Sequence, residues 1–334
     1  MERKLLLIFC LSFFSIGVSA QDLHLSQFYA NDHLLNPAKV GAHDGQYRIA
    51  SNYRNQWRQF GRPVNTSIIA ADNTFNYYSY NMDGGIMVAR DEFGGFNQTT
   101  HKVMFSAAYE LEYKEHQFRF GIQPGIVFRN TDLSTQTFPV QWNYPDGSFD
   151  QGLNHQEANI SENITHFDLN VGVMWRKEFE KTNVSAGFAL NHINRPKNTY
   201  FVEFAERLQT RKVFHAEVDY HVNQDVMISP KVLFMSTTMT NETLIGSTVS
   251  FNLPSDNFKR IFAGAFYRHG VDRNFDAFYP VIGFTYNQFD VGFSHDFHTS
   301  GVSAHGAKTT FELSIIYTAP NFSPKFITLP CDRY

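Results

Sequence analysis

An alternation of apolar and polar residues recurs along nearly the whole chain and limits what it can fold into. Residues 102–114 show the pattern. One face carries Val103, Phe105, Ala107, Tyr109, Leu111 and Tyr113, and the other carries Met104, Ser106, Ala108, Glu110, Glu112 and Lys114. Successive side chains of a β-strand point to opposite faces, so the pattern predicts strands with one apolar and one polar face. The repetition predicts an all-β protein.

About fourteen such segments follow one another, each roughly ten or more residues long, which is the length that a tilted strand needs to cross a bilayer. They begin near Gln46, Val64, Gly84, Lys102, Gln117, Ile164, Asn183, Lys212, Asp225, Glu242, Phe258, Asp276, Gln288 and Lys308. An even number of strands suits a closed antiparallel barrel. The alternation is weaker near Ile245, Ile261 and Tyr279, where both faces carry apolar residues.

The connections between these segments are short at one end and long at the other. If the chain enters the first strand from the periplasm, the turns after the even-numbered strands are all short. The longest connections, 131–163 and 193–211, then lie outside the cell. Outer-membrane barrels have this asymmetry, whereas a soluble β-sandwich has no reason to collect its long loops at one end. An open sheet edge in lipid would leave backbone groups unpaired. We therefore expect a closed transmembrane β-barrel of about 14 antiparallel strands.

The two ends of the chain predict export and location. Residues 1–20 resemble a signal peptide, with basic Arg3 and Lys4, an apolar run over 5–14, and small residues before Gln21. The expected organisation is an N-terminal periplasmic or plug segment over 21–44, the barrel over 45–319 and a periplasmic tail over 320–334. Signal cleavage leaves Cys331 as an unpaired thiol. We expect a multi-pass protein of the outer membrane of a Gram-negative bacterium.

The polar residues predict neither catalysis nor cofactor or metal binding. His215, Glu217, Asp219 and His221 share one strand face, which is ordinary for a polar barrel lumen. His295 faces away from Asp296 and His298, so this cluster offers too few ligands for zinc. The chain contains no Gly-x-Ser-x-Gly elbow of a hydrolase. With a net charge of −4 it has no basic surface for nucleic acid.

Aromatic residues in the two long connections form a candidate partner-binding surface. They are Phe138, Trp142, Tyr144 and Phe149 in the first connection, and Tyr200, Phe201 and Phe204 in the second. Rigid aromatic side chains often anchor interfaces. The alternative is that these loops fold over the barrel mouth and bury their own aromatics.

The stretch before the first strand also carries candidate residues outside any strand. They are Gln27, Phe28, Tyr29, Leu35, Asn36 and Pro37. Two interpretations stay open: the stretch fills the periplasmic mouth or lumen, or it docks a periplasmic partner.

Blocks at both ends of the chain resemble those of one protein family. The N-terminal blocks are Gln27-Phe28-Tyr29-Ala30, Leu35-Asn36-Pro37-Ala38 and Tyr53-Arg54-Asn55-Gln56-Trp57, and the C-terminal ones are DVGFSHDFHTS over 290–300, FELSIIY over 311–317 and PCDRY over 330–334. In this order they resemble the PorP/SprF family of type IX secretion in Bacteroidota. Lys39-Val40-Gly41 departs slightly from the usual pattern.

The resemblance implies a barrel similar to the fatty-acid channels and a non-enzymatic role in secretion and gliding. It implies binding of a secreted or cell-surface protein with a type IX C-terminal domain, of the periplasmic type IX lipoprotein complex, or of both. The core-machinery and cargo-dedicated branches of the family both stay open. The rival hypothesis is a diffusion channel for small or hydrophobic solutes.

Overall fold

The computed structural model describes residues 23–56, 62–77, 80–94, 97–134, 136–150, 152–153, 162–199, 206–238, 240–270, 277–298 and 309–321. Several predictions made above lie outside these residues. They concern the signal peptide over 1–20, Cys331, Tyr200, Phe201, Phe204 and all of the tail beyond Asn321.

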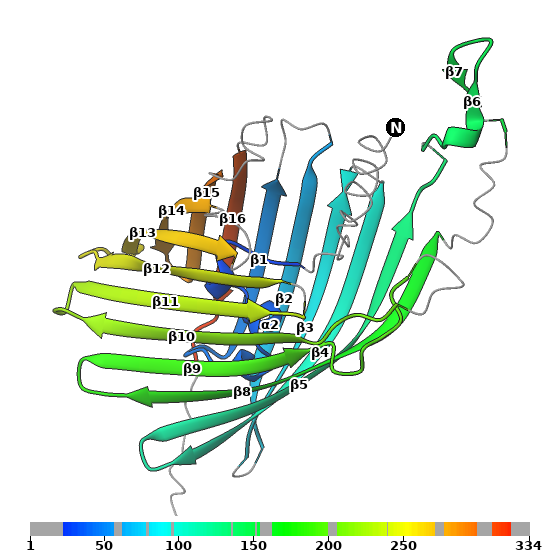
Figure 1. Cartoon of the computed structure of the whole chain (residues 1–334). Coiled ribbons are helices and arrows are strands. Elements are labelled where there is room, and N and C mark those ends of the chain that lie inside the picture. The colour runs from blue at the N-terminus through cyan, green and yellow to red at the C-terminus, as the bar shows by residue number, and fades with distance from the viewer. Residues whose placement is uncertain are drawn as a thin grey trace, which may run out of the picture.

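Fourteen antiparallel strands close into one barrel (Figure 1). They are β1 (Tyr47–Gln56), β2 (Val64–Tyr77), β3 (Tyr80–Phe93), β4 (Gln98–Tyr113), β5 (His116–Thr131), β8 (Asn163–Glu178), β9 (Thr182–Asn191), β10 (Arg211–His221), β11 (Val226–Ser236), β12 (Asn241–Asn252), β13 (Phe258–Gly270), β14 (Ala277–Tyr286), β15 (Phe289–His298) and β16 (Thr309–Thr318). Each strand pairs with its sequence neighbours, and β1 pairs with β16 to close the ring. The predicted fold and strand number are confirmed.

Two strand starts differ from the sequence expectation. β3 begins at Tyr80 rather than near Gly84, and β4 begins at Gln98 rather than near Lys102. The ladder continues beyond the alternating stretch on both sides, because Tyr77 pairs with Tyr80 and Phe93 pairs with Gln98. Backbone pairing needs no apolar side chain, so hydropathy alone places these starts too late.

The two ends of the barrel differ as the connection lengths predict. The short-turn end holds the tight connections, such as Lys114–Glu115 between β4 and β5. The long-loop end holds the connections 132–162 and 192–210. The first of these contains η4 (Pro139–Gln141) and a hairpin of β6 (Trp142–Asn143) and β7 (Ser148–Phe149). Figure 1 shows this hairpin projecting well beyond the barrel.

The burial pattern is the reverse of that in a water-soluble protein. On β4, Met104, Ser106 and Ala108 are buried inside the barrel, whereas the intervening Phe105 is 55% exposed on the outside. Large apolar side chains face outward in the same way on strands all around the ring. Such a surface is stable where its surroundings are apolar, as for the lipid-facing band of a membrane barrel.

Within the described residues, no helix has the length and apolar character needed to cross a membrane.

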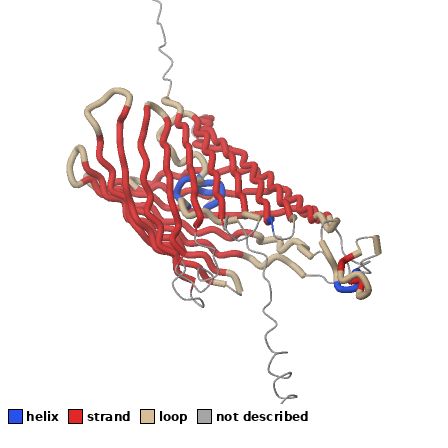
Figure 2. Tube along the Cα trace, turned by 90° about the horizontal axis from the view of Figure 1, so that it is seen from above, coloured by secondary structure: helices blue, strands red, loops and turns tan. Residues whose placement is uncertain are grey.

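Residues 23–46, hereafter the N-terminal segment, lie within the ring of strands (Figure 2). They form three short turns of helix: η1 (Phe28–Ala30), α2 (Asp32–Leu35) and η2 (Pro37–Lys39). The side chain of Asn31 accepts a hydrogen bond from the Leu34 N–H and caps α2. Asn36 caps η2 in the same way, by accepting from the Ala38 N–H. These caps replace the intrahelical bonds that such short helices lack.

The lumen also explains why the alternation is weak on β12 to β14. Leu244, Phe266 and Tyr279 lie on the inner face of these strands, and each is at most 1% exposed. They pack in one cluster with Phe28 and Leu35 of the N-terminal segment. The inner wall is apolar at this place because it contacts protein rather than water.

We predict that Phe105→Arg destabilises the barrel by about 2–4 kcal/mol, because it places a charge on the lipid face near the middle of β4. Tyr144→Arg, at a residue that is 87% exposed on the hairpin, should leave stability unchanged. Urea unfolding in liposomes measures the free energy of unfolding of both variants and of the wild type. Equal midpoints for Phe105→Arg and the wild type would contradict the lipid-facing assignment.

Candidate functional site

The N-terminal segment runs through the lumen from one end of the barrel to the other. Near the long-loop end, the Leu23 carbonyl accepts a hydrogen bond from Arg211 at the start of β10 (3.3 Å). Near the short-turn end, the Val40 carbonyl accepts one from Arg119 at the start of β5 (2.6 Å). The chain then leaves the lumen and enters β1, where Gln46 N–H donates to the Ala319 carbonyl (3.0 Å).

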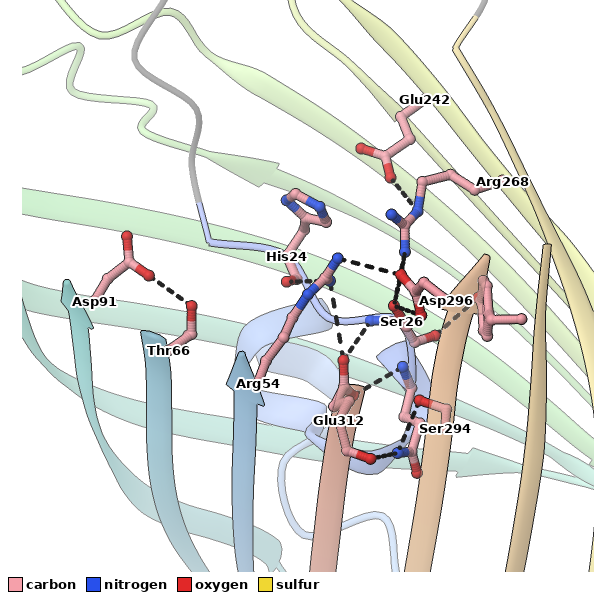
Figure 3. Close-up of polar contacts among 12 residues, drawn as sticks. His24, Ser26, Arg54, Thr66, Asp91, Glu242, Arg268, Ser294, Asp296 and Glu312 are labelled. Atoms are coloured by element: carbon pink, nitrogen blue, oxygen red, sulfur yellow. Dashed lines mark hydrogen bonds and ion pairs between the residues drawn. The ribbon is translucent and has the colours of Figure 1, made fainter. Parts of the chain in front are cut away.

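The first anchor joins Ser26 and Gln27 to two carboxylates of the barrel wall (Figure 3). Glu312 on β16 accepts both consecutive backbone N–H groups, from Ser26 to Oε2 (2.7 Å) and from Gln27 to Oε1 (2.9 Å). The Ser26 hydroxyl donates to Asp296 on β15 (2.8 Å). Hydrogen bonds to a charged acceptor are about twice as strong as neutral ones, so this contact fixes the segment firmly.

Two arginines neutralise these carboxylates. Arg268 on β13 donates to Asp296 (2.8 Å) and to the Ser26 hydroxyl (2.7 Å). Arg54 on β1 lies 3.5 Å from Asp296 and 3.9 Å from Glu312, and it donates to the His24 carbonyl (2.9 Å). Arg54, Asp296 and Glu312 are fully buried. Unpaired charges at such depth would be very costly, so the network holds only as a complete set.

A second anchor joins α2 and η2 to the first two strands. Asp32 forms ion pairs with Arg48 of β1 and with Lys39 (3.1 Å). Asp72 of β2 accepts from the Gly41 N–H (2.8 Å). Burial alone would raise the pKa of the Asp32 carboxyl, but the nearby Arg48 and Lys39 outweigh it and lower this pKa below its ordinary value of 3.8. Asp32 is therefore held as a carboxylate inside the barrel.

A third anchor closes the short-turn end. Arg119 donates from Nε to the Ala38 carbonyl (2.9 Å) and also contacts Asp83 and Glu110. Beside it lies a polar cavity of ≈ 210 Å³, lined by residues 41–44 and by side chains of the surrounding strands. No cluster of three or more potential metal ligands occurs in the part of the chain that the structure describes.

Glycines in the wall make room for the Leu-Asn-Pro-Ala block. A Cβ added to Gly172 on β8 would lie 1.9 Å from Asn36 Oδ1, and one added to Gly121 on β5 would lie 2.3 Å from the Ala38 nitrogen. Asn36 also donates to the Val173 carbonyl (3.1 Å) and contacts His215 Nε2 (3.0 Å). Since the Asn36 oxygen accepts from Ala38, its amide nitrogen must donate, and His215 Nε2 is therefore the acceptor.

The structure brings the N-terminal candidate residues together in the lumen. Gln27 and Asn36 are fully buried, and Phe28, Leu35 and Pro37 are buried as well. Tyr29 is half-buried and stacks on Phe266 with ring centroids 5.6 Å apart. In this conformation five of the six are buried, and Tyr29 is packed on the inner wall of the barrel.

The loop candidates are placed differently. Trp142 packs edge-on against Phe149 across the hairpin, with ring centroids 4.9 Å apart, while Tyr144 at its tip is 87% exposed. Phe138 precedes η4 and is half-buried. Tyr200, Phe201 and Phe204 lie outside the described residues.

Sequence reasoning missed the anchoring charges. Asp296 belongs to the cluster with His295 and His298, for which the sequence predicts no zinc site and no other role, yet it is fully buried against Ser26. Arg54, Arg268 and Glu312 were not singled out as site residues. The signal that could have found them is the repeated charge on inward positions of strands, because inward charges need partners.

We predict that Gly172→Ala displaces Asn36 and destabilises the packed N-terminal segment by about 1–3 kcal/mol, as overpacking does elsewhere. Gly84→Ala is the matched control, because its Cβ would come no closer than 3.3 Å to the Phe75 ring and 3.9 Å to the Ser106 carbonyl. Limited proteolysis within residues 23–46 measures how often the N-terminal segment leaves the lumen. Equal protection in the two variants would show that the Asn36 contact does not hold the segment.

We predict that acid loosens the segment through Asp32. Because the folded-state pKa lies below the ordinary value, the stabilisation is fully present above about pH 4 and is lost as the pH falls further. Asp32→Asn should reduce hydrogen-exchange protection of the segment already at neutral pH and flatten its acid dependence. The same pH profile for both proteins would contradict the assignment.

Comparison with solved structures identifies the fold. The chain is similar to the CymD monoaromatic hydrocarbon channel, with a TM-score of 0.52 and 11% identity over 87% of this chain and 93% of that one. It is also similar to the Pseudomonas putida toluene transporter TodX (TM-score 0.47, 9% identity, 85% and 91% coverage) and to a Pseudomonas aeruginosa FadL homologue (0.46, 11%, 85% and 92%). Among curated proteins, the sequence search finds no match.

The family comparison covers most of the chain. The model for "Type IX secretion system membrane protein PorP/SprF" matches residues 17–317. It describes a secretion membrane-protein family and not an enzyme family, and with the closed barrel it places the protein in the outer membrane. The family expected from the sequence is thereby confirmed, and the match includes every block named above except the one over 330–334. The chain belongs to the PorP/SprF family of type IX secretion system membrane proteins.

Proposed function

We propose that the protein is a non-enzymatic, closed component of type IX secretion that binds a secreted protein carrying a type IX C-terminal domain. The observation that carries this proposal is the projecting hairpin, where Trp142 and Phe149 brace each other and Tyr144 is 87% exposed. The Tyr144 ring is exposed to water on a hairpin that projects beyond the barrel (Figure 1). Exposed aromatic side chains are typical anchors of interfaces.

The filled lumen supports an interaction role over transport. CymD is a monoaromatic hydrocarbon channel, and this chain shares its fold. Here, however, Ser26 and Gln27 are tied to buried carboxylates on β15 and β16, and Arg119 ties down the other end of the segment. A diffusion channel would have to break both anchors before a solute could pass.

We further propose that the long-loop end faces outside and the short-turn end faces the periplasm. The secreted partner then meets the hairpin, and the periplasmic lipoprotein complex meets the short-turn end near residues 41–44. We assign the N-terminal candidate residues to filling the lumen rather than to docking, because five of the six are buried there and Tyr29 stacks on Phe266 of the inner wall.

Replacing the exposed tyrosine tests the proposal. Tyr144→Ala should weaken binding of the purified C-terminal domain of a type IX cargo from the same bacterium by about 30-fold, as expected when an anchor of about 2 kcal/mol is removed. Because Tyr144 is 87% exposed, stability should not change.

Tyr113→Ala is the matched control, since Tyr113 is 63% exposed at the short-turn end. It should bind like the wild type in the same surface-plasmon measurement. Unchanged binding by Tyr144→Ala, or an equal loss in both variants, would refute the hairpin as the binding surface.

A further inference from the structure

The barrel wall is incomplete on one side of β8. β8 pairs with β5 along its whole length, from Asn130↔Asn163 to His116↔Lys177. On its other side it pairs with β9 only from Val171↔Leu190 onward, because β9 ends at Asn191. Residues 163–170 therefore form a sheet edge at the long-loop end.

The deeper part of this edge is capped by the connection that follows β9. Ile193 N–H donates to the Leu169 carbonyl (3.0 Å). The Asn194 side chain accepts from the Leu169 N–H (3.2 Å) and donates to the Phe167 carbonyl (2.7 Å). One amide side chain thus takes the place of a neighbouring peptide group.

The capping contacts show which backbone groups point to the open side. Leu169 turns its N–H and C=O away from β5, where it lies opposite Pro124, which has no N–H. Alternate residues of an antiparallel strand point the same way, so the Phe167 N–H and both backbone groups of Thr165 also face the open side. Among the described residues, no hydrogen bond reaches these three groups.

The open stretch lies at the boundary of the apolar band. Outward-facing Phe128 and Phe167 are 44% and 52% exposed, whereas the next outward residues toward the loops are Asn130 and Thr165. Asn130 donates to the exposed Asn163 side chain (2.7 Å). Backbone groups cannot stay unpaired in lipid but tolerate water. The edge is therefore capped from Leu169 to the Phe167 carbonyl, and it is open from the Phe167 N–H to Thr165, where the outward-facing residues become polar.

We propose that this edge, centred on Thr165, pairs with an extended β-strand of the secreted partner, which would add to the barrel wall beside β8. The inference rests on the proposed function and adds the mode of binding. An exposed edge presents donors and acceptors at strand spacing, which only an extended chain matches along its length. The hairpin that carries Tyr144 emerges between β5 and β8, so a partner held there lies close to this edge.

Thr165→Pro tests the edge. Proline removes the N–H that faces the open side and leaves the β5 ladder intact, a position that edge strands tolerate. It should weaken binding of the same purified C-terminal domain about tenfold, as for one lost hydrogen bond. Thr165→Ala keeps the N–H and should bind like the wild type. Heat-modifiable migration in gels checks that both variants fold.

A photocrosslinking residue at position 165 gives a second test that does not depend on the proline variant folding. It should form an adduct with the mass of barrel plus domain, whereas the same residue at Ile245, on the lipid face of β12, should form none. An adduct of two barrels would overturn the proposal in favour of a second copy. If Thr165→Pro binds like the wild type, the proposal that the partner pairs with this edge is refuted, but the proposed function is not. No binding by the wild-type chain would overturn both this inference and the proposed function.

Discussion

The structure depends on the buried charges that hold the chain's own N-terminal segment inside the barrel. Glu312 accepts two consecutive N–H groups of the segment, and Asp296 binds its serine hydroxyl. Arg54 and Arg268 balance these carboxylates, and all four residues are at most 2% exposed. Removing one member would leave a buried charge unpaired, which typically costs about 3–5 kcal/mol. The barrel and the segment therefore form one cooperative unit.

Membrane and lumen together shape the composition of the strands. Outward positions carry Phe, Ile and Tyr because they meet lipid. Inward positions are charged where the segment presents backbone groups, glycine where Asn36 and Ala38 approach closely, and apolar where Phe28 and Leu35 pack. The same inner wall thus changes character around the ring, following the surface of the segment it holds. Because the N-terminal segment occupies the inner wall and lipid covers the outer wall, the two ends of the barrel and their loops are the surfaces open to partners.

Much of the fold could be predicted from the sequence because lipid imposes a simple alternation on each strand. This alternation predicts the strand number and most strand starts, such as those at Val64 and Phe258. The site was less predictable. The pairing of Asp296 with Ser26 joins residues far apart in the chain, and no local pattern encodes such a contact. The early end of β9, which leaves the Thr165 edge open, also depends on tertiary structure, since hydropathy does not report which strand lies alongside.

The most direct test of the closed lumen is single-channel conductance of the full chain in planar lipid bilayers. The anchors at both ends of the N-terminal segment predict no steady conductance for the wild type. A triple variant, Asp296→Ala with Glu312→Ala and Arg119→Ala, should conduct because it loses both the carboxylates that bind Ser26 and Gln27 and the arginine that binds Ala38 and Val40. Steady conductance by the wild-type protein would contradict the account and favour a channel.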